Sequence, residues 1–247
     1  MLEPFFQDPY CTVYHADCLA VLPKLGVKAD LIICDPPWGV SGEQDVVIHL
    51  KEGDKVTGWQ WDRFKGNEFW GFTFKWADAT IPLLKDGGHL IVWFDAWKIS
   101  PLAAYLEEKG LRRCQALQWV KTNATPQMRA VGFMSSVESA FWFTKGDKSG
   151  TFNHKLGERP NYWRLSPGSD GARFHPTQKP TEMIMTLISY LTKEGDLVVD
   201  PMFGGGSTLV AAKRLGRYSL GIEKELGYCQ VARYRLLATP LPMLVEA

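Results

Sequence analysis

Cysteine is sparse in this sequence, and so are the features that accompany secretion or membrane insertion. The cysteines lie far apart, at positions 11, 18, 34, 114 and 229, so a disulfide framework is not indicated. No basic-then-apolar signal segment opens the chain, and no apolar run approaches the length that would cross a bilayer. These absences exclude a disulfide-rich secreted protein and a membrane-spanning one, and they predict a protein of a reducing cytoplasm.

Metal-ligand clusters and a phosphate-binding P-loop are also missing. His15 and Cys18 could share a metal, but they have no further ligands nearby, so a structural pair is the better interpretation. The glycines at 204–206 are not followed by the Gly-Lys-Ser/Thr ending of a P-loop. The sequence therefore predicts no metal site and disfavours a P-loop.

Net charge is close to zero, but the charges are segregated along the chain. The formal net charge is +1, while residues 1–110 hold 10 Lys and Arg against 16 Asp and Glu. Residues 111–180 hold 11 Lys and Arg against 4 Asp and Glu, with aromatic side chains interleaved. Such a stretch is typical of a surface that binds a polyanion such as nucleic acid, although a merely solvated face would have the same composition.

Strand-like and helix-like segments alternate over the 247 residues, a length that allows one large domain or two small ones. Apolar or alternating runs predict strands at 11–15, 29–34, 89–94, 116–121, 139–145, 196–200 and 216–223. Asp86, Gly87 and Gly88 predict a turn into the third of these strands. Helices are predicted at 18–25, 67–84 and 96–109, after Pro180, and after each of the last two strands. The alternation predicts an α/β fold with a mainly parallel sheet and helices on both faces.

The apolar run at 29–34 ends abruptly in Asp35, Pro36, Pro37 and Trp38. Asp before Pro commonly starts a turn, and a plain turn is one interpretation of this block. The other interpretation is a binding site, because open α/β sheets place their ligands at the carboxyl ends of the strands.

A second chemical feature is VVDPMFGGGST at 198–208, where three glycines lie between a buried strand and an Ala/Leu helix. Glycines let the backbone pass close to a ligand, and Ser207 with Thr208 can cap the helix, although a tight turn would also use glycines. Glu223 ends the next strand, 17 residues beyond Gly206, near the spacing at which an acid binds ribose hydroxyls. Loop and acid together predict a nucleoside-bearing cofactor.

These blocks resemble the β class of DNA amino-methyltransferases, which use S-adenosylmethionine. The matching stretches follow the family's order: HADCLAVLPKLGVKADLIICDPPWG, then the weaker WDRF and WVKTN, then HPTQKP, DPMFGGGST and GIEKELGYCQVARYRL. The resemblance implies a permuted class I methyltransferase with a Rossmann-like fold and a single catalytic domain over 1–247. It also implies a loop insertion at about 39–66 and a short target-recognition region at about 122–174.

The resemblance also assigns roles to individual residues. Catalysis is expected at Asp35, Pro36, Pro37 and Trp38. Cofactor binding is expected at Asp17, Cys18, Asp35, Lys179, Asp200, Pro201, Phe203, Gly204, Gly205, Gly206, Ser207, Thr208, Glu223 and Lys224. DNA contacts are expected at Lys121, Asn123, Arg129 and His175, of which Lys121 and Arg129 are chosen because they flank the irregular stretch 122–128 of the basic segment. Trp38 departs from the usual Tyr, which preserves a stacking surface but loses a hydroxyl.

The expected activity is site-specific methylation of adenine N6 in double-stranded DNA, with the target base flipped out of the helix. Asp35 and the Pro36 carbonyl would accept the two N–H hydrogens of the amine, and the prolines would fix these acceptors in advance. Asp at the head of the block resembles the adenine enzymes, whereas the cytosine-N4 enzymes usually carry Ser. Cytosine N4 stays open as the alternative, followed by an RNA adenine methyltransferase and an inactive DNA-binding relative. A bacterial or phage origin is expected, and homodimer formation is left open.

Overall fold

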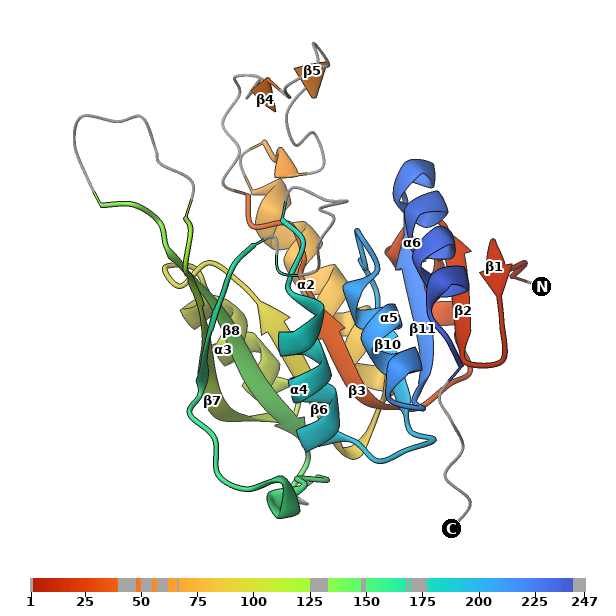
Figure 1. Ribbon diagram of the computed structural model, residues 1–247. Helices are drawn as coiled ribbons and strands as arrows, with labels where there is room; N and C mark the ends of the chain where they lie inside the picture. The colour runs from red at the N-terminus through yellow and green to blue at the C-terminus, as the bar shows by residue number, and fades with distance from the viewer. Residues whose placement is uncertain are drawn as a thin grey trace.

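The structure of the chain is a computed structural model. It describes residues 2–39, 48–49, 55–56, 62–65, 67–124, 133–147, 150–167, 169 and 177–241. One large sheet runs through these residues, and helices lie on both sides of it (Figure 1).

The described residues form a nine-stranded sheet in the order β1-β2-β11-β10-β3-β6-β8-β7-β9. The bounds are β1 Phe6–Gln7, β2 Cys11–His15, β3 Ala29–Cys34, β6 Leu84–Trp93, β7 Leu111–Lys121, β8 Val137–Lys145, β9 Tyr162–Leu165, β10 Leu197–Asp200 and β11 Tyr218–Glu223. A separate pair joins β4, Ile48–His49, to β5, Lys55–Val56.

Strand direction brings distant segments to one edge of the sheet. The neighbours from β2 through β11, β10 and β3 to β6 are parallel, whereas β6 with β8 and β8 with β7 are antiparallel. β9 is parallel to β7, and β1 is antiparallel to β2. The carboxyl ends of β2, β11, β10, β3, β6 and β7 therefore lie at the same edge as the start of β8, which we call the site edge.

Helices cover both faces of the sheet because the central strands are buried on both sides. In β3, Leu31 and Ile33 pack with α4 and α5, whereas Ile32 and Cys34 pack with α1, α2 and α3. This double burial explains why the segment is apolar without alternation. The α-helices are α1 Cys18–Val21, α2 Glu68–Thr80, α3 Ile99–Glu108, α4 Thr181–Leu191, α5 Ser207–Arg214 and α6 Leu226–Ala238, and the 3-10 turns are η1 Leu22–Lys24, η3 Ile81–Leu83 and η4 His154–Leu156.

The architecture confirms the predicted α/β fold, and each predicted strand is present. The turn predicted at Asp86–Gly88 is wrong as a strand boundary, because these residues form an irregularity inside β6, opposite Ala29 and Leu31 of β3. Gly87 has a φ of 79° there, and a Cβ on Gly88 would lie 2.9 Å from the Lys85 carbonyl oxygen, so the glycines serve a bulge. The short strand β9 was not predicted.

Two predicted regions are only partly described. Most of the insertion at about 39–66 lies outside the described residues, as do 125–132, 148–149, 168 and 170–174 of the expected target-recognition region. The single catalytic domain with these two regions therefore stays a prediction. Within the described ranges, no helix is both long and apolar enough to cross a membrane.

Candidate active site

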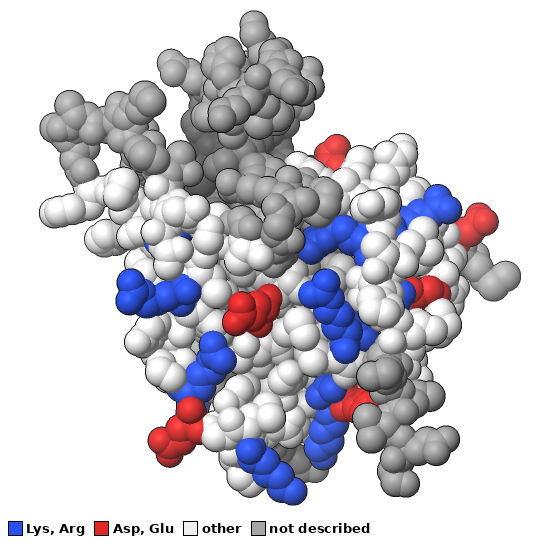
Figure 2. All heavy atoms as spheres, in the orientation of Figure 1, with Lys and Arg blue, Asp and Glu red and all other residues white. Residues whose placement is uncertain are grey.

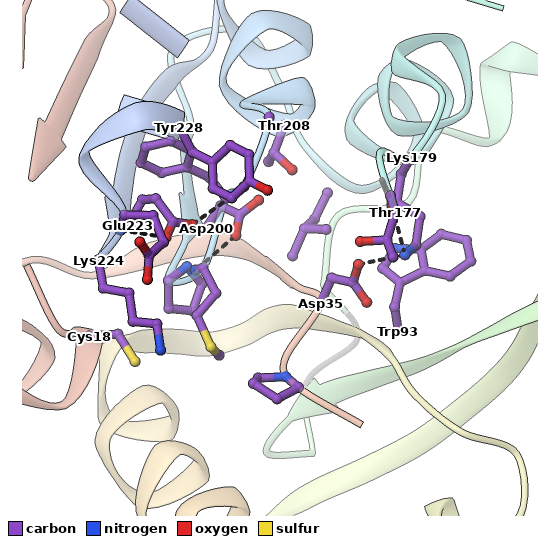
Figure 3. A pocket seen from close by; sticks show the side chains of 18 of the residues that line it. Cys18, Asp35, Trp93, Thr177, Lys179, Asp200, Thr208, Glu223, Lys224 and Tyr228 are labelled. Atoms are coloured by element: carbon purple, nitrogen blue, oxygen red, sulfur yellow. Dashed lines mark hydrogen bonds and ion pairs between the residues drawn. The ribbon is translucent and has the colours of Figure 1, made fainter. Parts of the chain in front are cut away.

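A cavity of about 340 Å³ opens at the site edge, between the ends of β2, β3, β6, β10 and β11. Figure 3 shows Glu223, Lys224 and Tyr228 at one end of the cavity and Asp35, Lys179 and Trp93 at the other, with Asp200 between them. We call these the loop end and the Asp35 end.

The cavity brings together residues that the sequence singled out from widely separated segments. Its lining includes Asp17, Cys18, Asp35, Pro37, Lys179, Asp200, Pro201, Phe203, Gly204, Gly205, Ser207, Thr208, Glu223 and Lys224. Three further expected residues, Pro36, Trp38 and Gly206, lie next to lining residues in the chain but are not part of the lining.

The glycine loop at the loop end is held by the acid that follows it. The Gly204 N–H donates to Oε2 of Glu223 at 3.0 Å, and the Glu225 N–H donates to Oε1 at 2.9 Å. Gly206 has a φ of 78°, and a Cβ placed on it would lie 3.0 Å from that of Ala232 in α6. Glycine is thus required at this position by both conformation and space.

Arg235 of α6 secures the same loop from the other side. Its Nη1 donates to the Gly205 carbonyl and lies 3.5 Å from Oγ of Ser207, while Nη2 lies 3.3 Å from Oγ1 of Thr181 at the start of α4. One guanidinium therefore connects the loop to α4, α5 and α6. No pattern in the sequence indicated this role for Arg235, which lies in the last turn of α6.

Burial alters the ionisation of the acids that line the cavity. It raises the pKa of Asp200 to about 7, against hydrogen bonds from Thr208 and from the Met202 backbone. It also raises the pKa of Glu223, although backbone N–H groups of Glu225 and Gly204 oppose the shift. Both side chains face space in which a ligand with hydroxyl groups or positive charge would restore the lost solvation.

Asp17 and Lys224 lie beside this end. Asp17 caps α1, with its Oδ1 accepting from the Leu19 N–H at 2.8 Å. Nε2 of His15 lies 3.0 Å from the Lys224 carbonyl oxygen, so the chain after Glu223 is tied to the end of β2. Cys18 is buried, and burial raises the pKa of its thiol to about 12, so it contributes packing and not a thiolate.

Asp35 directly follows β3 and forms an ion pair that the sequence did not reveal. Lys179, which precedes α4, donates from Nζ to Oδ2 of Asp35 at 2.5 Å. Burial raises the pKa of Asp35, and Lys179 opposes that shift. Lys179 was expected among the cofactor-binding residues, whereas its ammonium lies on the carboxylate expected to be catalytic.

The loop that follows Asp35 is fixed by two side chains. Nζ of Lys98 donates to the carbonyl oxygens of Trp38 and Gly39, at 2.6 and 2.9 Å. Oδ1 of buried Asp62 accepts from the Gly39 N–H at 2.6 Å. Trp38 is half-buried and packs against apolar side chains on both faces of the sheet. Its expected stacking with a base stays a prediction.

Trp93 is a lining residue that the sequence did not single out. It ends β6, beside Asp35, and is 1% exposed. The sequence feature that could have identified Trp93 is its position, as a bulky residue at the carboxyl end of a buried strand. The other lining residues missed were Ala16, Ile33, Arg63, Phe64, Phe72, Thr177, Gln178, Ile184, Met202, Glu225 and Tyr228.

The residues expected to contact DNA are less free than their composition suggested. Nζ of Lys121 lies 2.6 Å from Oε1 of Glu138, and Oδ1 of Asn123 accepts from Ser166 at 2.9 Å. Arg129 and His175 lie outside the described residues. Lys145 donates to the carbonyl oxygens of Ile81 and Leu84. Part of the basic excess in 111–180 is therefore used within the fold. Figure 2 shows Lys and Arg side chains spread over the visible face with acidic side chains between them.

Metal-binding groups are not found in the described ranges, where no cluster of three His, Cys, Asp or Glu side chains is placed to hold an ion.

Comparison with known proteins identifies the family. Residues 29–234 match the family described as DNA methylase, of the N6/N4 type. The chain is 31% identical over 257 residues to the type II methyltransferase M2.DpnII of Streptococcus pneumoniae, covering 96% of this chain and 94% of that one. It is 30% identical to M2.LlaDCHI of Lactococcus lactis subsp. cremoris, covering 96% and 93%.

Solved structures agree with this assignment. The M1.HpyAVI–SAM complex superposes with a TM-score of 0.74 at 28% identity, covering 92% of this chain and 98% of that one. The cytosine-N4-specific PvuII DNA methyltransferase has a TM-score of 0.75 at 19% identity, covering 99% and 91%, and shows the shared fold. By sequence and by structure, the chain belongs to the N6/N4 family of DNA methylases.

Proposed function

We propose that this DNA methylase transfers a methyl group from S-adenosylmethionine to the N6 amine of adenine at a specific site in double-stranded DNA. The observation that carries the proposal is the position of Asp35. This residue directly follows β3 and lines the cavity, and its carboxylate accepts a hydrogen bond from Lys179. The relatives are bacterial type II methyltransferases, which supports action in a bacterial cytoplasm.

The loop end of the cavity fits the cofactor. Glu223 is 9% exposed, and each of its oxygens accepts one backbone N–H, which leaves lone pairs for ribose hydroxyls. The glycine loop presents backbone without side chains, and Asp17 lies on the adjoining wall as the proposed partner of the adenine. Bound there, S-adenosylmethionine supplies a methyl group made reactive by its sulfonium.

The Asp35 end has the groups that the acceptor amine requires. An exocyclic amine is a poor nucleophile because its lone pair is delocalised into the ring. Asp35 and the Pro36 carbonyl each accept one of its N–H groups, which turns the lone pair out of the ring plane. As the new N–C bond forms, the nitrogen loses one proton, and Asp35 is the base that receives it.

The target base must leave the DNA stack to reach Asp35. Asp35 lines the cavity and its side chain is 26% exposed, whereas the amine of a base in an intact duplex is held within the base stack. We propose that the base is flipped out and that Trp38 lies alongside it. Assembly into a homodimer stays a prediction.

Adenine is favoured by the residue that opens the catalytic block. Asp35 resembles the adenine enzymes, whereas Ser is usual in the cytosine-N4 enzymes. Both amines present two hydrogens to the same acceptors, so cytosine N4 is the outcome against which the proposal is tested.

Nucleoside mass spectrometry decides between the two bases. The chain is expressed in a host whose DNA is free of methylation, with an empty-vector host as the control, and the digested DNA is analysed. We expect N6-methyladenine without N4-methylcytosine, and single-molecule sequencing of the same DNA then gives the site. N4-methylcytosine alone would show the adenine assignment to be wrong, and methylated RNA with unmethylated DNA would refute the DNA substrate.

A further inference from the structure

A chain of four alternating charges leads away from Asp35 into the antiparallel part of the sheet. Nζ of Lys179 lies 2.5 Å from Oδ2 of Asp35 and 3.1 Å from Oε2 of Glu138. The other oxygen of Glu138, Oε1, lies 2.6 Å from Nζ of Lys121. The four side chains come from four separate segments and carry two negative and two positive charges, so their formal charges cancel.

The strand order explains how these groups meet. Asp35 follows β3, Glu138 starts β8 and Lys121 ends β7, so all three lie at the site edge. β6 separates β3 from β8, and Lys179 spans this gap above Trp93, the last residue of β6. Glu138 pairs in register with Trp119 of β7, two residues before Lys121.

Aromatic rings and burial limit the access of water to Lys179 and Glu138. Nζ of Lys179 lies 5.2 Å from the ring centre of Trp93 and 5.6 Å from that of Trp38. The side chains of Lys179, Glu138 and Lys121 are 7%, 13% and 19% exposed. The attraction between opposite charges is stronger at buried positions than at the surface. Removing one charged side chain therefore leaves its partner as a buried charge without a counterion.

Glu138 is ionised in this setting although it is buried. Burial acts to raise the pKa of Glu138, but Lys179 and Lys121 outweigh it and hold the pKa below its ordinary value. Burial acts to lower the pKa of Lys179, but Asp35 and Glu138 outweigh it and raise that pKa. Glu138 therefore keeps Lys179 charged, and Lys179 in turn opposes the protonation of Asp35.

We propose that Glu138 is a positioning residue for methyl transfer. By sharing the ammonium of Lys179 with Asp35, it places that ammonium between two carboxylates and fixes the plane of the Asp35 carboxylate through Oδ2. Asp35 also accepts a hydrogen bond from the Trp38 side chain, and its further lone pairs are left to the amine. Glu138 is not among the described residues that line the cavity, so its proposed role is exerted through Lys179. The inference deepens the proposed function and rests on it.

The decisive variant is Glu138→Gln, which keeps the shape of the side chain and removes its charge. Single-turnover methylation at saturating DNA and cofactor is expected to fall by about 100-fold, because displaced reacting groups lose rate steeply. Cofactor affinity, measured by calorimetry, is expected to stay within about threefold of the wild type, since the loop end is untouched. Glu108→Gln is the matched control, as this exposed glutamate on α3 is remote from the network.

The pH profile separates a positioning role from a merely structural one. With Glu138 neutral, Asp35 is the one close carboxylate left to Lys179 among the residues that the structure describes, so the pKa of Lys179 falls and the alkaline limb of the rate moves to lower pH. The charged groups near this network are Asp35 from β3, Glu138 from β8, Lys121 from β7 and, toward the loop end, Asp200 after β10. Glu138→Asp keeps the charge and is expected to restore the wild-type alkaline limb with a rate reduced by about tenfold.

Several outcomes would refute a positioning role for Glu138. A Glu138→Gln enzyme with the rate and pH profile of the wild type refutes the proposal, and so does a parallel loss of rate, cofactor affinity and thermal stability. If Glu138→Gln does not fold, Glu138→Asp is compared with Glu108→Asp, and an unchanged rate in the former refutes it. A wild-type chain that binds the cofactor but methylates no DNA refutes the proposed function itself, and with it this inference.

Discussion

At the loop end of the cavity the acid is held by backbone N–H groups, whereas at the Asp35 end the acid is held by other side chains. Glu223 accepts from the backbone of Gly204 and Glu225, which no substitution short of proline removes. Asp35 depends on Lys179, which depends in turn on Glu138. Apart from Arg235, which secures the glycine loop from α6, residues outside the loop end should therefore tolerate substitution, while the Asp35 end should respond to single substitutions on distant strands.

The strongest test of this difference is Asp35→Ala. The rate of methyl transfer is expected to fall by about 10³-fold or more, because the amine loses its acceptor and its base. Cofactor affinity should change little, since Glu223 and the glycine loop are intact. Single-turnover kinetics and calorimetry on the same preparation measure the two effects, and a joint loss would mean that the two ends are not separable.

Asp200, between the two ends, gives a pH dependence of stability. Its pKa is raised to about 7 in the folded chain, so between about pH 4 and pH 7 the folded state binds more protons than the unfolded state. Its contribution to stability is complete at low pH and is lost as the pH rises through about 7, by on the order of 4 kcal/mol. Asp200→Asn removes this dependence.

Denaturant unfolding of the wild type and Asp200→Asn at a series of pH values measures that contribution. Between pH 4 and pH 7, the free energy of unfolding of the wild type is expected to fall relative to that of Asp200→Asn. Parallel curves for the two proteins would show that Asp200 ionises normally.

Glu223→Ala tests the loop end directly. Loss of the proposed ribose hydrogen bonds and of the loop's acceptor is expected to weaken cofactor binding by ~1–3 kcal/mol, seen by calorimetry. Glu223→Gln retains one acceptor oxygen and should show a smaller loss. An unchanged affinity in both variants would remove Glu223 from the cofactor site.

Gly206→Ala examines the loop backbone. The added Cβ meets Ala232 at 3.0 Å, and the φ of 78° disfavours any side chain, so a loss of ~1–3 kcal/mol in stability is expected. Gly71→Ala in α2 is the opposite control, because its Cβ meets nothing within 4 Å and alanine favours the helix by ~0.5–1 kcal/mol. Thermal unfolding of the two variants should therefore shift in opposite directions.

The loop end could be predicted from the sequence because its parts are contiguous. Asp200 to Thr208 is one stretch, and Glu223 follows at a spacing set by one helix and one strand. The arrangement at the Asp35 end could not be predicted from the sequence, although Asp35 and Lys179 were each named as expected site residues. Their pairing depends on α4 beginning over the end of β3, and Glu138 reaches them only because β8 runs antiparallel. No local pattern around Glu138 indicates the direction of its strand. The charge count placed Lys121 and Lys179 in one basic stretch, and the sequence predicted DNA contact for Lys121 and cofactor binding for Lys179, not ion pairs with Glu138.

During synthesis, β2 and β3 leave the ribosome long before the strands that separate them in the sheet. β11 pairs with β2, β10 pairs with β3, and both arrive after the whole middle of the chain has been made. At about 5–20 residues per second the delay is on the order of ten seconds. Until then two strand edges lack their partners, and Arg235, in the last helix, has not yet reached the glycine loop. A chain ended before β10 would carry the complete Asp-Pro-Pro-Trp block without the glycine loop and Glu223, so it would lack most of the proposed cofactor site.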